Sequence, residues 1–405
     1  MIYLKKNVCT LSKLVFKCTC HGQFYSTSKN ISENLKSLKK LKHTENMFVV
    51  DNDVAKDISD TICTHLTRSY DSKLIKLIEA NPGVCLITRH ILEKTNNNIH
   101  VFENNNNEFL AAVHSVFGNR INITKSNFLL LWKYGYQDRM DYGDRISKIL
   151  SGLGTPQPWN LERPSFQIIA ALPSRKFLNY LIYSFMFQTG LMTYGRPEFY
   201  LLLQPSVFTR YSSKPIIGEM YYKTQTILFQ TIFDLELLKT YPRTAFFPLQ
   251  SLKSTSKFVR FKELKELDNK FMVLVKVTGR KNLLEKEDLT IDLLKPFWYF
   301  VKHHTLSRKN FVIPMLEQWI PGCGPHFIAQ GYTTFTQFGD LTPSQILYIF
   351  LKFVNLPEYK DSPFISAMES RISKLSPSVP TDNSNYLQST NDSSLDLEEC
   401  DSKNV

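Results

Sequence analysis

The chain has 405 residues, 43% of them hydrophobic, and carries 49 Lys and Arg against 37 Asp and Glu, a formal net charge of +12. A chain of this length and apolar content buries a large core, which excludes fibrous, collagenous and wholly disordered classes. No window reaches the roughly 18 to 20 apolar residues that a membrane-spanning helix needs, so we expect no membrane span. The basic excess favours a polyanionic partner, nucleic acid first.

The charge is unevenly distributed along the chain. Residues 1–32 contain five Lys and no acid, interleaved with apolar residues and followed by hydroxyl groups, which is typical of a mitochondrial transit peptide. A ragged basic N-terminus without a targeting role is the alternative. Residues 376–405 carry six acidic residues against one Lys, and their low hydrophobicity predicts a disordered acidic tail. The two ends cancel, so residues 33–375 keep the full +12.

Apolar periodicity predicts alternating strands and helices. A capped helix is expected after Asp51, followed by a strand near residues 74–78, a tight turn at residues 79–83 and a helix over residues 86–92. This alternation predicts a parallel sheet, and two later candidates indicate that it closes on an antiparallel edge. From about residue 290 only helices are expected. The further strands are expected at 99–102, 121–124, 166–171, 199–203, 235–238 and 271–277, and the further helices at 109–117, 177–187, 293–301, 311–320 and 343–354.

The first turn is a candidate nucleotide site. Ligands of open α/β sheets lie at the carboxyl ends of the strands, where a glycine lets the backbone approach the ligand. Gly83 occupies that turn, and Glu103 ends the next strand, where an acid can accept hydrogen bonds from both ribose hydroxyls. In the plainer alternative, Gly83 only turns the chain and Glu103 only ends a strand.

Several motifs resemble, in order, those of the ribosomal RNA adenine dimethyltransferase family. The resemblance spans roughly residues 45 to 360, and its later motifs are similar to a mitochondrial branch of the family that helps mitochondrial RNA polymerase to melt promoters. It implies a Rossmann-like class I S-adenosylmethionine-dependent methyltransferase fold over residues 45–290 and a smaller helical domain over 291–375. The motifs are at 48–51 (Phe-Val-Val-Asp), 79–88 (Glu-Ala-Asn-Pro-Gly-Val-Cys-Leu-Ile-Thr), 101–103 (Val-Phe-Glu), 171–175 (Ala-Leu-Pro-Ser-Arg), 194–198 (Tyr-Gly-Arg-Pro-Glu) and 241–248 (Tyr-Pro-Arg-Thr-Ala-Phe-Phe-Pro).

The resemblance also implies a set of cofactor-binding residues. Asn127 stands where the family usually has Asp to accept a hydrogen bond from the adenine amino group, and Val84 and Cys85 replace small residues of the glycine loop. We therefore expect weakened binding of S-adenosylmethionine. The expected contacts are Val49, Glu79, Gly83, Glu103 and Asn127.

The catalytic motif departs further from the family pattern. Active members have Asn-Leu-Pro followed by Tyr or Phe: the Asn orients the adenine amino group and the ring grips the flipped base. The chain has Ala171, Leu172, Pro173 and Ser174, which keep the turn but lack both groups. We expect weak or absent methyl transfer, and no residue is assigned a catalytic role.

The basic charge predicts nucleic-acid binding. Lysines and arginines alternate with Phe258 and Phe261 between the sheet and the C-terminal helices, a pattern typical of single-strand binding but also of a half-buried strand. Other candidates are weaker: His303 and His304 are expected to be a solvated pair, and Asp138, Asp141 and Asp144 lack the Glu that closes a calcium loop. The seven cysteines show no paired spacing. The predicted nucleic-acid contacts are Arg175, Arg196, Lys257, Arg260 and Lys262.

Three functions are compatible with these features. The first is an initiation factor of the mitochondrial matrix nucleoid, which binds mitochondrial RNA polymerase and the single-stranded non-template strand of promoter DNA. The second is an active adenine dimethyltransferase of the mitochondrial small-subunit rRNA. The third is a ribosome-assembly protein without catalysis, which only the identity of its partner separates from the first.

Overall fold

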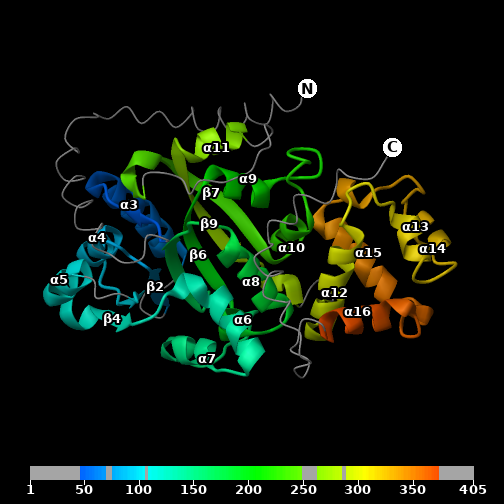
Figure 1. Ribbon diagram of the computed structural model, residues 1–405, viewed down its shortest axis with the longest axis horizontal. Coiled ribbons are helices and arrows are strands. Elements are labelled where there is room, and N and C mark those ends of the chain that lie inside the picture. The colour runs from blue at the N-terminus through cyan, green and yellow to red at the C-terminus, as the bar shows by residue number, and fades with distance from the viewer. Residues whose placement is uncertain (1–45, 70–74, 105–107, 249–261, 285–288, 374–405) are drawn as a thin grey trace, which may run out of the picture.

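A central twisted sheet with helices on both faces forms the larger part of the molecule, and a group of helices packs to one side of it (Figure 1). The computed structural model describes residues 46–69, 75–104, 108–248, 262–284 and 289–373. The predicted transit peptide, the predicted acidic tail, Lys257 and Arg260 lie outside these residues. Within the described ranges, no helix has the length and apolar character to cross a membrane.

The sheet has seven strands, and all but one run in parallel. Its order is β4 (Ile121–Thr124), β3 (Ile99–Phe102), β2 (Lys76–Ala80), β5 (Phe166–Ala171), β6 (Pro197–Leu203), β9 (Phe271–Gly279) and β7 (Phe233–Pro242). Only β9 is reversed, and it pairs antiparallel with β6 on one side and β7 on the other. This order confirms the α/β prediction and the Rossmann-like methyltransferase class. The prediction that the sheet closes on an antiparallel edge is confirmed, because the edge strand β7 pairs antiparallel with β9.

Helices cover both faces of the sheet because its strands alternate their side chains. Leu77 and Ile169 point toward one face, where α3 and α4 pack, whereas Ile78 and Ile168 point toward the other face, where α8 and α10 pack. The helices of this part are α3 (Asn52–Ser69), α4 (Leu86–Lys94), α5 (Glu108–Phe117), α6 (Leu131–Asp141), α7 (Arg145–Leu150), α8 (Lys176–Met186), α9 (Pro205–Ser212), α10 (Thr224–Ile232) and α11 (Lys262–Asp268).

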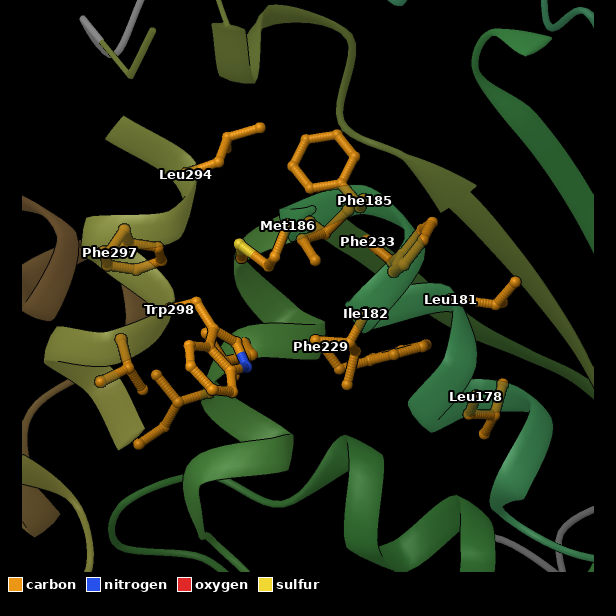
Figure 2. Packing of buried hydrophobic residues seen from close by; sticks show 14 of the residues in the cluster. Leu178, Leu181, Ile182, Phe185, Met186, Phe229, Phe233, Leu294, Phe297 and Trp298 are labelled. Carbon is orange, nitrogen blue, oxygen red and sulfur yellow. The ribbon is translucent and has the colours of Figure 1, made fainter. Parts of the chain in front are cut away.

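The C-terminal helices share a hydrophobic core with the sheet. Figure 2 shows side chains of α8, among them Ile182 and Phe185, facing Leu294 and Trp298 of α12. Buried residues of the C-terminal helices belong to the same contiguous cluster as β5 and α8. The division near residue 290 stays a prediction. These helices are α12 (Ile291–His304), α13 (Val312–Glu317), α14 (Gly324–Ile328), α15 (Pro343–Val354) and α16 (Pro363–Ser373).

The prediction that His303 and His304 form a solvated pair was wrong, because His304 is buried. His304 is fully buried at the end of α12, and its Nδ1 lies 2.7 Å from the Phe300 carbonyl. Trp319 donates its indole N–H to the other ring nitrogen of His304 at 3.2 Å. Burial lowers the pKa of His304 to about 3, so the ring is neutral and can accept that bond. The residue joins α12 to the segment after α13.

Candidate functional site

The carboxyl ends of β2, β3 and β4 meet at one edge of the sheet, together with a two-stranded ribbon. In this ribbon β1 (Phe48–Val49) pairs antiparallel with β8 (Phe246–Phe247). The Phe48 ring lies directly on the first loop, since a Cβ built on Gly83 would be 2.1 Å from the Phe48 Cδ1. Gly83 has φ +61°, a left-handed conformation. Glycine is therefore required here both for its backbone conformation and for the close approach of Phe48.

Two further residues of this loop are left-handed although they are not glycine. Asn81 has φ 54° and Cys85 has φ 58°. Asn tolerates this conformation well, whereas Cys does not favour it. The Cys85 side chain is fully buried in the cluster beneath α3 and α4, and its thiol lies 3.6 Å from the Gly83 carbonyl. The backbone of the loop thus adopts left-handed conformations that favour glycine, although Asn81 and Cys85 carry larger side chains, which are buried.

Two buried acids flank this loop. Glu79 at the end of β2 accepts a hydrogen bond from the Thr88 hydroxyl of α4, and burial raises the pKa of Glu79 to about 7 despite that bond. Glu103 follows β3 and is 3% exposed. Burial raises the pKa of the Cys85 thiol well above its usual value, and the negative charges of Glu79 and Glu103 add to that effect. Both predicted acids therefore lie close to the same loop.

A chain of amide hydrogen bonds ties three segments together at this edge. Asn127 accepts at Oδ1 from Asn81 Nδ2 at 2.7 Å and from the Leu129 backbone N–H at 3.1 Å. It donates from Nδ2 to Asn46 Oδ1 at 3.3 Å. Both lone-pair positions of the Asn127 carbonyl are therefore occupied within the protein. Sequence reasoning missed Asn46 and Asn81; the tolerance of Asn for left-handed turns was the available signal for Asn81.

Unpartnered polar atoms gather at the same edge. Four of the buried side-chain atoms that have no hydrogen-bond partner among the described residues lie here: Asn46 Nδ2, Asn81 Oδ1, Asn104 Oδ1 and Ser126 Oγ. They belong to segments at or just beyond the ends of β2, β3 and β4, or to the segment entering β1. Each such atom costs about 1–3 kcal/mol when no ligand satisfies it. The donors and acceptors fit a polar, nucleoside-like group, so these residues are compatible with S-adenosylmethionine.

The end of β5 lies next to β2 but is arranged differently. The Leu172 N–H donates to the Leu202 carbonyl at 2.9 Å, and Leu172 itself is buried. Ser174 accepts at Oγ from the Lys176 N–H at 3.4 Å, at the start of α8. Neither Ala171 nor Ser174 has the carboxamide or the aromatic ring that would hold a flipped adenine. The bond from Leu172 continues the ladder between β5 and β6 by one residue.

Predicted nucleic-acid contacts fall in different environments. Arg175 is half-buried at the N-terminus of α8, and Lys262 begins α11. The assignment of Arg196 is corrected, because this residue is only 4% exposed. Its guanidinium donates to the carbonyls of Leu161 at 2.7 Å and Glu162 at 3.0 Å, so Arg196 fastens two chain segments together.

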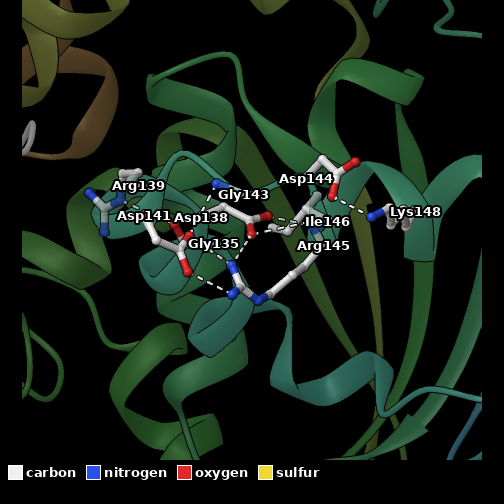
Figure 3. Close-up of polar contacts among 9 residues, drawn as sticks. All are labelled: Gly135, Asp138, Arg139, Asp141, Gly143, Asp144, Arg145, Ile146 and Lys148. Atoms are coloured by element: carbon white, nitrogen blue, oxygen red, sulfur yellow. Dashed lines mark hydrogen bonds and ion pairs between the residues drawn. The ribbon is translucent and has the colours of Figure 1, made fainter.

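The aspartates in the last turn of α6 and just before α7 bind basic groups and backbone N–H groups (Figure 3). Asp138 accepts from the Ile146 N–H at 2.8 Å and from Arg145 Nη1 at 3.0 Å. Asp141 pairs with Arg145 at 2.6 Å, and Asp144 pairs with Lys148 at 2.8 Å. The described residues contain no group of three or more potential metal ligands. Each of the three acids contacts a residue in the first turn of α7, and these contacts account for their spacing.

Comparison with known proteins bears on this geometry. No family model matches the chain. The mitochondrial dimethyladenosine transferase 2 of Drosophila melanogaster is 29% identical over 380 residues, covering 83% of this chain and 82% of that protein. The chain is related to mitochondrial dimethyladenosine transferase 2. It is built on an rRNA adenine dimethyltransferase scaffold.

More distant similarities are to two rRNA methyltransferases and a dimethyladenosine transferase. The ribosomal RNA small subunit methyltransferase A of Cytophaga hutchinsonii is 24% identical over 220 residues, covering 54% of this chain and 70% of that protein. Among solved structures, the 23S rRNA methyltransferase ErmE has a TM-score of 0.45 and 14% identity, covering 76% of this chain and 99% of its own. A Plasmodium falciparum dimethyladenosine transferase has a TM-score of 0.46 and 13% identity, covering 73% and 95%.

Proposed function

We propose that the chain is a mitochondrial transcription initiation factor that assists mitochondrial RNA polymerase in promoter melting by binding nucleic acid. The observation that carries the proposal is the end of β5, where Ala171 and Ser174 stand in place of the groups that grip an adenine. Removing one positioned polar group from an active site costs about 2.7–4 kcal/mol in the transition state. Two such losses lower a methyl-transfer rate by several powers of ten.

The placement of the basic segment supports nucleic-acid binding. Residues 249–261 contain three basic residues and no acidic one. The chain enters this segment from β8, which pairs with β1, and leaves it into α11. Asp268 of α11 accepts a hydrogen bond from the Ser206 N–H at 2.8 Å, at the start of α9 beyond the carboxyl end of β6. The described elements on either side of the segment, β8 and α11, therefore both lie near the edge that carries the candidate site.

The proposed ligands are the single-stranded non-template strand of promoter DNA and the polymerase itself. Basic groups that follow a phosphate chain, with aromatic residues between them, bind single strands without reading their sequence. The name of the Drosophila relative supports a mitochondrial location. The proposed location is the nucleoid of the mitochondrial matrix, where promoter DNA and polymerase would both be available.

The second candidate function is enzymatic: an adenine dimethyltransferase of the mitochondrial small-subunit rRNA. The unpartnered amides around Asn127 favour it, because they suit a bound nucleoside. S-adenosylmethionine, when bound, supplies an activated methyl group. Val49, Gly83, Glu103 and Asn127 would hold it, with weakened affinity, since the Asn127 carbonyl already accepts two hydrogen bonds.

Transcription in vitro separates these functions. The chain is added to mitochondrial RNA polymerase on a duplex promoter and on the same promoter with a pre-melted bubble. We expect the duplex to require the chain and the bubble to need it far less. A parallel assay measures methyl transfer to the small-subunit rRNA hairpin. Efficient methylation without any stimulation of the duplex promoter would refute the proposal and favour the second candidate.

A further inference from the structure

A cavity of about 120 Å³ lies at the opposite edge of the sheet from the candidate site. It is lined where β2 and β5 begin, by Lys76 and Phe166, and by Tyr194 at the end of the short helix η5 (Gly190–Tyr194). Parallel strands place their amino ends together, so this cavity is separated from the cofactor edge by the length of the strands. It is a different site from the one described above.

The polar residues that line the cavity all carry hydrogen-bond donors. They are Lys76, Thr155, Gln157, Arg163, Ser165 and Tyr194. Two of them are positively charged, and none of the lining residues is acidic. The acid next to the wall, Glu162, is ion-paired with Lys281. A lining rich in donors and carrying two positive charges matches an oxyanion, which has only acceptors. We propose that this cavity binds a phosphate group.

The hydroxyl of Ser165 is a buried donor without a partner. Its Oγ is inaccessible to solvent and makes no hydrogen bond to any described residue. A Cβ built on Gly195 would lie 2.0 Å from this oxygen, and Gly195 has φ +103°. The hydroxyl therefore occupies the space that a side chain at position 195 would take. Since no water-sized group reaches this oxygen, it belongs to the packed wall of the cavity, and a ligand is bound by the other donors of the lining.

The walls of the cavity are held in place before any ligand arrives. Lys76 donates from Nζ to the carbonyls of Gly152 at 3.2 Å and Leu153 at 2.9 Å, which leaves one ammonium proton for a ligand. The buried Arg196 guanidinium holds the carbonyls of Leu161 and Glu162, next to Arg163. Arg196 is thus a positioning residue for this wall. Prepositioned donors lose less freedom on binding than flexible ones.

The volume suits the ligand. A cavity of about 120 Å³ is large enough for a tetrahedral oxyanion. Lys76 and Arg163 are both exposed, so a larger molecule can extend into solvent while its phosphate enters. Free phosphate and the terminal phosphate of a nucleic-acid strand share this chemistry.

Calorimetric titration of the full chain with inorganic phosphate tests the site, with chloride at matched ionic strength as the reference. We expect saturable binding that Arg163→Ala weakens at least about tenfold. The matched control is Lys133→Ala, which removes an exposed positive charge on α6 away from the cavity and should leave the affinity unchanged. Equal losses in both variants, or no phosphate-specific heat in the parent chain, would overturn the proposal.

Oligonucleotides with a 5′-phosphate or a 5′-hydroxyl distinguish the sources. A preference for the phosphorylated strand that Arg163→Ala abolishes identifies a strand end as the ligand. Equal binding of the two oligonucleotides, together with retained binding of inorganic phosphate, identifies the free anion. Neither result depends on the proposed transcription role.

Discussion

The two halves of the candidate site have diverged to different degrees. Around β2, β3 and β4 the chain keeps buried acids, a left-handed loop and unpartnered amides. At the end of β5, the neighbour of β2 in the sheet, Ala171 and Ser174 lack the carboxamide and the ring that would hold a base. The difference follows from how each half is stabilised. Glu79, Asn81 and Asn127 are parts of the fold, whereas a catalytic carboxamide and ring contribute to binding and chemistry alone.

The largest expected effect comes from restoring the weaker half. In Ala171→Asn/Ser174→Phe the two missing groups return to the end of β5. At about 2.7–4 kcal/mol each, they should raise methyl transfer to the small-subunit rRNA hairpin by roughly 10⁴-fold or more if the cofactor half is competent. Radiolabelled methyl transfer measures the gain. The control adds Glu103→Ala to the same variant, which should remove most of it.

Failure of this rescue has two readings that binding data separate. If the double variant binds S-adenosylmethionine in a calorimetric titration yet gains no activity, the proposed cause of inactivity is wrong. If no binding occurs, the cofactor half has been lost too, and the contrast between the halves disappears.

The next largest effect tests how tightly the cofactor half is built into the fold. Gly83→Ala places a Cβ 2.1 Å from the Phe48 ring at a residue with φ +61°. Left-handed strain of about 1–2 kcal/mol and overpacking of about 1–3 kcal/mol should together lower the free energy of unfolding by about 2–5 kcal/mol. Gly118→Ala is the matched control, since it has φ +49° and nothing within 4 Å of the added Cβ. Urea unfolding of both variants isolates the Phe48 contact; equal losses would show that it is unimportant.

Local patterns predicted the elements well and their neighbours less well. Residues 121–124 and 166–171 are strands as predicted, because short apolar runs bounded by turn residues are decided locally. Periodicity indicated the antiparallel edge, but it does not say which of its two strands pairs with β6. The burial of two polar side chains, Arg196 and His304, was also not predicted. Arg196 and His304 are charged or titratable types that are usually exposed, and only the tertiary fold supplies the carbonyls and the indole that satisfy them.

A smaller effect concerns proton linkage in the cofactor half. Burial raises the pKa of Glu79 from 4.5 to about 7, so between these values the folded chain binds more protons than the unfolded chain. The stability associated with Glu79 is therefore fully present below pH 4.5 and is lost as the pH rises through about 7. The loss is on the order of 3 kcal/mol. Glu79→Gln should flatten the pH dependence of unfolding over this window, whereas Ser174→Ala at the end of β5 should not. If the pH dependence of unfolding is unchanged in Glu79→Gln, the raised pKa of Glu79 is contradicted.

The smallest effect tests the basic segment beside the two halves. Lys257→Ala/Arg260→Ala/Lys262→Ala removes three of the positive charges that the sequence predicts to contact nucleic acid. Each phosphate contact contributes about 0.7 to the slope of log affinity against log salt for a single strand, so losing three should flatten that slope by about 2. Filter binding of a single-stranded promoter oligonucleotide over a salt series measures it, with Lys133→Ala as the control. If the slope is unchanged, the basic charge that serves nucleic acid lies elsewhere. If it flattens while methyl transfer in the rescued enzyme is unaffected, strand binding and base chemistry are separable functions of one edge.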